Sequence, residues 1–102
     1  NLFGHQLVCH EVAAGTAIKV NPSNAVDGHD VPIPHFGVVL EMDTWKGLRD
    51  RLIANKMQFI IEPHIRFPGQ AGEQATMFFQ DPSGNAVEFK AFADIETELF
   101  KA

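Results

Sequence analysis

Residues 78–89, FFQDPSGNAVEF, decide the fold of this chain. Proline and glycine stand in 81–85 where a tight turn requires them, and β-forming residues flank the turn on both sides. The stretch therefore predicts a hairpin between a strand over 75–80 and a strand over 86–92. In the second of these strands Glu88 lies on the face opposite to Val87 and Phe89, because successive side chains of a strand alternate.

The sequence before this hairpin adds a strand, a helix and a further strand. Residues 34–40, PHFGVVL, read as a strand with Phe36, Val38 and Leu40 on one face. Asp43 or Thr44 can cap a helix that runs to about residue 55, with apolar residues at helical spacing on one side. Residues 58–65 predict a strand, and the acidic tail over 94–102 predicts a helix. From residue 34 the predicted order is therefore strand, helix and three strands.

The N-terminal third reads differently. In residues 2–12 the side-chain pattern alternates with a period of two, which predicts a strand. Residues 13–33 have the composition of turns and predict a long connection. Residues 3–8 echo 83–88, since each is a glycine followed by a strand pattern. We therefore expect one domain over 1–102: 1–12 as the last strand of a first module that is largely missing, 13–33 as the connection, 34–92 as the second module, and 93–102 as the tail.

Composition excludes several classes of protein. The chain has 102 residues, 45% of them hydrophobic, which suits one globular domain, and no apolar run is long enough to cross a membrane. Its net charge of −5 comes without a basic stripe, so nucleic acid is not an expected partner. The single cysteine, Cys9, cannot form an internal disulfide, and a reducing compartment, the cytoplasm, is expected.

Two chemistry-bearing residues share the face that the helix leaves free. If the apolar faces pack on the helix, His35 and Glu88 both project from the other side of the sheet. An imidazole and a carboxylate suit Fe, Zn, Mn or Ni, and two histidines with one carboxylate form the non-haem Fe(II) pattern. The alternative is structural: His35 would be a hydrogen-bonded residue at a strand end, and Glu88 a solvated partner of Lys90.

Three further residues are candidates for the same face. His10 lies on the same face of the predicted strand as Gln6 and Val8. If that face lines the cavity, His10 can act there as an acid or base; the alternative is an exposed histidine at a strand end. Gln6 would then line the substrate pocket. Phe78 lies on the same strand face as Thr76 and Gln80, and it either lines the pocket or belongs to the core.

Residues 34–40 and 78–89 resemble the vicinal oxygen chelate superfamily, which includes glyoxalases, extradiol dioxygenases and bleomycin-resistance proteins. The resemblance implies an α+β fold in which paired βαβββ modules form a curved mixed sheet around a cavity with a metal. It also implies that His35 and Glu88 are ligands. Val8 stands at the position where the first module would carry the counterpart of Glu88, so that module offers no carboxylate there. A site with this ligand set resembles that of extradiol dioxygenases. The resemblance therefore implies a third ligand, a histidine, on a strand before Asn1.

The resemblance implies a metal-dependent enzyme acting on a small oxygen-rich molecule that chelates the metal, with Fe(II) favoured and Zn, Mn or Ni as alternatives. An extradiol-dioxygenase-like oxygenase is favoured, and a glyoxalase-like lyase or isomerase is second. The rival is a metal-free, drug-binding protein of the bleomycin-resistance type. We also expect a homodimer, because a single module leaves a sheet face and sheet edges without partners.

Overall fold

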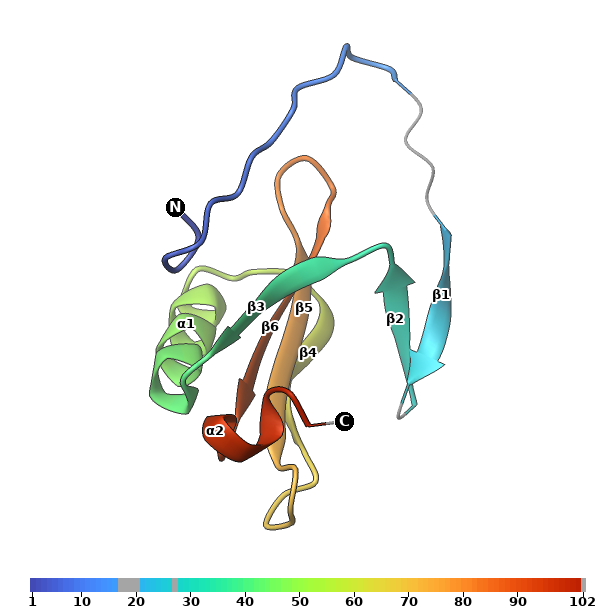
Figure 1. Cartoon of the computed structure of the whole chain (residues 1–102). Coiled ribbons are helices and arrows are strands. Elements are labelled where there is room, and N and C mark those ends of the chain that lie inside the picture. Colours follow the sequence, from blue (N-terminus) through green and yellow to red (C-terminus); the bar gives the residue numbers. More distant parts are fainter. Residues whose placement is uncertain (17–20, 27, 102) are drawn as a thin grey trace.

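The computed structural model describes residues 1–16, 21–26 and 28–101, with side chains for 1–16 and 28–101. The chain has an α+β fold, in which helix α1 (Met42–Ala54) covers one face of a curved, mixed four-stranded sheet (Figure 1). The strand order is β3-β6-β5-β4, with bounds Phe36–Leu40, Ala86–Phe92, Gln74–Gln80 and Phe59–Arg66. Strand β3 runs parallel to β6, and the other neighbours are antiparallel. The predicted order of strand, helix and three strands is confirmed.

The helices differ from expectation in detail. Helix α1 begins after Glu41, whose side chain makes no capping hydrogen bond, so the predicted cap at Asp43 or Thr44 is wrong. The tail forms the short helix α2 (Ile95–Glu98), in which the Asp94 carboxylate accepts a hydrogen bond from the backbone of Thr97. Neither described helix has the length and apolar character needed to span a membrane.

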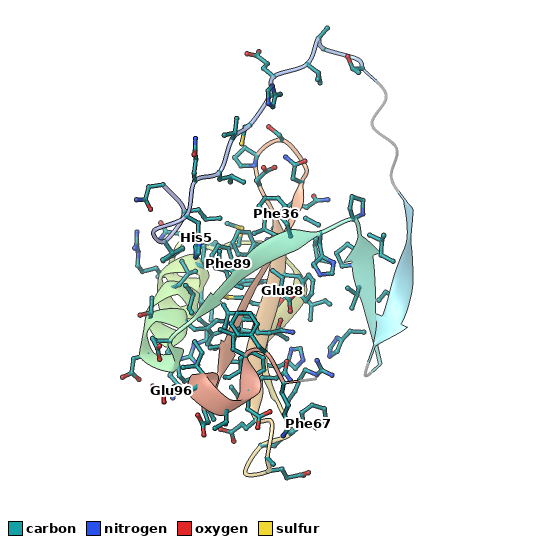
Figure 2. All side chains as sticks on the ribbon, viewed as in Figure 1. His5, Phe36, Phe67, Glu88, Phe89 and Glu96 are labelled. Carbon is teal, nitrogen blue, oxygen red and sulfur yellow. The ribbon has the colours of Figure 1, made fainter. Side chains whose placement is uncertain are left out.

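The core lies between α1 and the sheet. Trp45 is 1% exposed, and its indole N–H donates to the backbone carbonyl of Phe89 over 2.8 Å. This bond ties the helix to β6, because an indole N–H needs an acceptor when it is buried. Phe79 stacks on Phe89 with ring centroids 5.5 Å apart. The predicted faces of β6 are therefore right, and Figure 2 shows Phe89 on the helix side and Glu88 toward the opposite side.

Phe36 is an exception to the predicted core. It is 41% exposed, although it shares its strand face with the buried Leu40. Phe36 is the first residue of β3, which forms an edge of the sheet, and only the far end of that strand reaches the core under α1. Alternation gives the face of a residue but not how far the covering helix extends.

The strand predicted over residues 1–12 does not form. Leu2 packs against the core and Phe3 lies edge-on to Phe89 at 5.8 Å, but residues 6–13 have no strand structure and are exposed. Alternation produces a strand only where another strand satisfies its backbone groups. Within the described part of the chain, no strand pairs with this segment.

The predicted irregular connection contains a hairpin instead. Strands β1 (Asn21–Val26) and β2 (His29–Ile33) pair antiparallel in a separate two-stranded sheet. Prolines in this segment argued against strands, but a two-stranded ribbon has a free outer edge on each strand, where a missing N–H is tolerated. Residues 17–20 and 27 of the predicted connection lie outside the described residues. The hairpin stands on the side of the sheet away from α1 (Figure 1).

Candidate functional site

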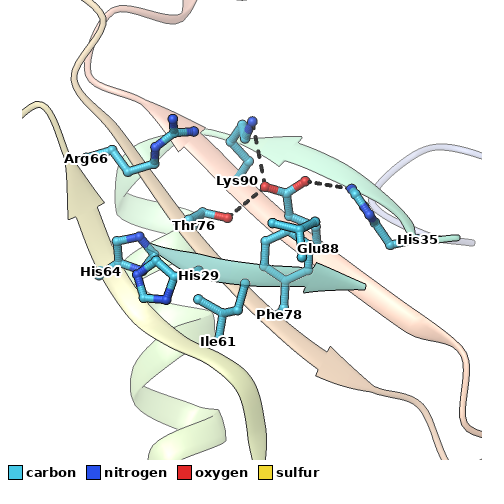
Figure 3. Close-up of a pocket in the computed structure, with 10 residues that line it drawn as sticks. His29, His35, Ile61, His64, Arg66, Thr76, Phe78, Glu88 and Lys90 are labelled. Atoms are coloured by element: carbon cyan, nitrogen blue, oxygen red, sulfur yellow. Dashed lines mark hydrogen bonds and ion pairs between the residues drawn. The ribbon is translucent and has the colours of Figure 1, made fainter. Parts of the chain in front are cut away.

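A cavity of about 190 Å³ opens on the face of the sheet that α1 does not cover (Figure 3). Strand β2 forms one wall, and the sheet forms the floor. Ten residues line it: His29, Val31, His35, Ile61, His64, Arg66, Thr76, Phe78, Glu88 and Lys90.

His35 and Glu88 meet in this cavity. Nε2 of His35 lies 3.5 Å from Oε2 of Glu88. The other ring nitrogen, Nδ1, is 2.8 Å from the backbone carbonyl of Pro32 and must donate to it, because a carbonyl only accepts. In the neutral ring this leaves the lone pair of Nε2 on the side of Glu88, which is how metal-ligating histidines are commonly oriented. Phe78 lies edge-on to His35 at 5.0 Å and limits its rotation.

The carboxylate of Glu88 is held from two further sides. Thr76 Oγ1 donates to Oε1 of Glu88 over 2.7 Å, and Nζ of Lys90 lies 3.6 Å from the same oxygen. The Glu88 side chain is 17% exposed. A charged group at this depth needs such partners, because burial removes its hydration. The carboxylate is therefore fixed in place, with Oε2 directed to His35.

Gly37 allows β3 to lie beside Glu88. The two residues are paired in register, and a Cβ built on Gly37 would overlap the backbone carbonyl of Glu88. Any other residue would push β3 away from β6 and move His35, two positions earlier, with it. Alternation along the strand places Gly37 on the face of His35, but the close approach to Glu88 depends on the pairing of two strands that are distant in sequence.

The histidine of β4 reaches the cavity through an irregular strand. The register of β4 against β5 shifts on both sides of Ile61, and Pro63 stands within the second shift. Ile61, His64 and Arg66 all line the cavity as a result, although simple alternation would place His64 on the other face from Ile61. His64 stacks on His29 of β2 with ring centroids 4.6 Å apart, which joins the hairpin to the sheet.

The structure brings together three of the five predicted site residues. His35, Glu88 and Phe78 line one cavity. Gln6 and His10 are exposed on the N-terminal segment and are not among the lining residues, because their placement presupposed a strand that the described chain lacks.

Five polar lining residues were not among the predicted site residues: His29, His64, Arg66, Thr76 and Lys90. The cavity positions of Lys90 and Thr76 could have been predicted, because alternation places Lys90 on the strand face of Glu88 and Thr76 on that of Phe78. Pro63 signals an irregular strand and could have placed His64 on the cavity side.

The donor set fits a divalent transition metal in part. An imidazole nitrogen and a carboxylate oxygen point at each other across a cavity, which is the chemistry that Fe, Mn, Ni and Zn accept. The described residues contain no group of three His, Cys, Asp or Glu side chains that could hold a metal. Of the described residues, therefore, His35 and Glu88 would contribute two ligands, and the others would come from outside this set.

No model of a known protein family matches the chain, and no curated protein matches it either. Among solved structures, it is similar to the crystal structure of a glyoxalase/bleomycin resistance protein/dioxygenase from Alicyclobacillus acidocaldarius, with a TM-score of 0.62 and 28% sequence identity. The similarity covers 93% of this chain and 65% of that chain, so the present chain spans somewhat less than two thirds of its neighbour's length. The neighbour confirms the α+β fold expected from residues 34–40 and 78–89.

Proposed function

We propose that this chain, which has the fold of the vicinal oxygen chelate superfamily, is part of a metal-dependent enzyme that acts on a small oxygen-rich molecule able to chelate the metal. The observation that carries the proposal is the pair of His35 and Glu88. Each is positioned by its own hydrogen bonds, and both face one cavity on the helix-free side of the sheet. Paired donors of this kind in a pocket are typical of a site rather than of a solvated surface.

His35 and Glu88 would hold a divalent metal, Fe(II) in the favoured case, with at least one further ligand from a module other than residues 34–92. When bound, such a metal polarises the oxygens of a chelating substrate and fixes its orientation. Thr76 and Lys90 keep the Glu88 carboxylate in its ligating position, and the carbonyl of Pro32 keeps Nε2 of His35 available.

The remaining lining residues can shape the substrate pocket and exchange protons with the substrate. Val31, Ile61 and Phe78 form the apolar part of the cavity lining. His29 and His64 lie at the same cavity, and imidazole is the side chain best suited to exchange protons near neutral pH. We assign a general acid or base role to this pair in preference to His10. Extradiol-type oxygenation is the favoured reaction, and a glyoxalase-like isomerisation or lysis is the second.

A metal-free binding protein of the bleomycin-resistance type is the second candidate. It is favoured by the contacts of Glu88, whose carboxylate is already satisfied by Thr76 and Lys90, so it needs no metal to be stable where it lies. In that case the cavity would sequester a small molecule without changing it.

Metal content separates the two candidates. The protein is purified without chelators, reconstituted anaerobically with Fe(II), Mn(II), Zn(II) or Ni(II), passed through a desalting column and examined by elemental analysis. Retention of one of these metals supports the enzyme, which is then tested for oxygen uptake with catechols. Loss of all four metals on desalting, with the protein still folded, supports the metal-free binder.

A further inference from the structure

The hairpin that forms one wall of the cavity contacts the sheet through two histidines. His29 of β2 stacks on His64 of β4, with ring centroids 4.6 Å apart and ring planes inclined by 28°. Both residues are half-buried and line the cavity, and Figure 3 shows their rings beside each other. A two-stranded hairpin has little stability of its own in water. Contacts of this kind therefore decide whether the wall stays in place.

The orientation of the His64 ring shows where it gains a proton. Nδ1 of His64 lies 2.9 Å from the backbone carbonyl of Glu62 and must donate to it, because a carbonyl only accepts. In the neutral ring Nε2 therefore carries the lone pair, and a second proton enters there. Imidazole is the side chain that changes its charge between about pH 5 and 8. A modest fall in pH is thus enough to charge a ring at this contact.

The charge of the two rings decides whether they attract or repel each other. Two neutral imidazoles stack, and one imidazolium still stacks on a neutral ring, as a cation does on an aromatic face. Two imidazolium rings at 4.6 Å repel each other, and half-burial leaves less water to screen the repulsion. The contact is therefore stable when at most one ring is charged, and it is lost as the pH falls and the second ring gains its proton.

The strands around the pair contribute few groups that titrate near neutral pH. Neither β1 nor β5 contains a titratable residue. The charged side chains that line the cavity from β4 and β6 are Arg66, Lys90 and Glu88. Arginine and lysine keep their charge through this range, and carboxylates generally keep theirs above about pH 5. His35 lines the cavity too, but Figure 3 shows it at the end away from the pair, where it faces Glu88.

The acidic residues next to the two histidines in sequence complete the surroundings. Asp30 and Glu62 are both exposed. Asp27, between β1 and β2, lies outside the described residues. Because carboxylates titrate at lower pH than imidazoles, a change that is complete above about pH 5 is assigned to histidine and not to these residues.

We propose that the His29–His64 pair is a pH-sensitive latch on the wall of the cavity. At neutral pH the stacked rings hold β2 against β4, and in mild acid the two charged rings separate and the hairpin leaves the sheet. The four-stranded sheet stays folded, because its core lies on the other face, under α1. Opening removes His29 and Val31 from the cavity lining, so a ligand bound at neutral pH is released in acid. The latch requires no metal and is independent of the reaction that the cavity performs.

Hydrogen exchange and NMR on the metal-free wild-type protein test the latch at about pH 7.5 and about pH 5. Exchange of the backbone amides of β2 is corrected for the intrinsic effect of pH, and its protection is expected to fall at least about tenfold in acid. The nuclear Overhauser contact between the His29 and His64 rings should disappear over the same range. Protection of β5 and β6 should stay unchanged, which distinguishes opening of the hairpin from unfolding of the domain.

Three variants assign the change to this pair. His64→Phe and His29→Phe each keep an aromatic ring at the contact but remove one of the two charges, so each should retain the protection of β2 at both pH values. His10→Phe replaces an exposed histidine outside the cavity and should open as the wild type does.

Three results would each overturn the latch. The first is unchanged protection of β2 in the wild type at about pH 5, and the second is an equal loss of protection in β5 and β6. The third is an acid response of His64→Phe or His29→Phe equal to that of the wild type, which would assign the change to another group. The first two results come from the wild type, so they stand even if a variant does not fold.

Discussion

Nε2 of His35 lies 3.5 Å from Oε2 of Glu88, across the parallel pairing of β3 and β6. Neither side chain belongs to the helix-packed core, and each is oriented by a different neighbour, the carbonyl of Pro32 for the imidazole and Thr76 for the carboxylate. The sheet thus holds a nitrogen and an oxygen donor facing each other with little freedom to separate. This relationship is the basis of the proposed metal site.

Gly37 is expected to be intolerant of a side chain. Gly37→Ala should destabilise the protein by about 1–3 kcal/mol, because the new methyl overlaps the Glu88 carbonyl and forces β3 from β6. Gly47→Ala is the matched control, since a Cβ there meets nothing within 4 Å and alanine favours the helix. Urea denaturation of both variants measures the difference. Equal stability of the two would mean that β3 does not approach β6 closely.

Phe89 is expected to be a main contributor to stability. Phe89→Ala should lower the free energy of unfolding by ~3–5 kcal/mol, as truncation of a buried aromatic residue does. Phe36→Ala is the control on the same side of the sheet, and its cost should be under about 1 kcal/mol because Phe36 is 41% exposed. Thermal or urea unfolding of both variants tests this. A small loss for Phe89→Ala would place the core elsewhere and reverse the faces that carry Glu88.

The turn that leads into β6 is expected to lose stability in acid. The Asn85 side chain, and more weakly the backbone amides of 83–85, donate hydrogen bonds that hold the pKa of Asp81 below its ordinary value. A carboxylate whose pKa is lowered by folding stabilises the protein above its unfolded-state pKa, and this contribution disappears as the pH falls through the folded-state value.

Asp81→Ala should therefore cost about 1 kcal/mol at neutral pH, and the cost should shrink when unfolding is measured at progressively lower pH. Asp30→Ala, at an exposed position of β2, is the control. A cost for Asp81→Ala that is the same at every pH would contradict the role of the charge.

Much of the second module could be predicted from local pattern. The turn at 81–85 and the alternation of β6 predict the hairpin, and the same alternation puts Glu88 opposite to Phe89. The side of His35 follows in the same way. These predictions succeed because each rests on a single strand or turn.

The rest depends on partners that local pattern does not contain. Residues 2–12 alternate like a strand, but no described strand pairs with residues 6–13, which have no strand structure. His64 reaches the cavity only because β4 shifts its register near Pro63, and Arg66 follows it. His29 enters through a hairpin in a segment whose prolines argued for turns. The full lining of the cavity therefore becomes visible only in the assembled fold.

We expect the protein to assemble as a homodimer. The N-terminal segment exposes Leu7, Val8 and Val12, at 44%, 61% and 55%, and strand β3 is an edge of the sheet. Apolar side chains and an unpaired edge are stabilised when a second module covers them, and a two-fold dimer is the commonest closed arrangement. Multi-angle light scattering at micromolar concentration gives the mass. A monomeric mass at every concentration would contradict this expectation.

The most direct test of the proposed function is the affinity of the protein for Fe(II) and for a spectroscopically convenient substitute such as Co(II), measured by anaerobic titration. His35→Ala and Glu88→Gln are compared with wild type, and His10→Ala and Glu62→Gln serve as controls because they alter the same residue types outside the cavity. Both cavity variants should remain folded and bind metal at least about tenfold more weakly, as loss of a ligand requires, while both controls bind as wild type does. Wild-type affinity in His35→Ala and Glu88→Gln together would contradict the assignment of these two residues as metal ligands.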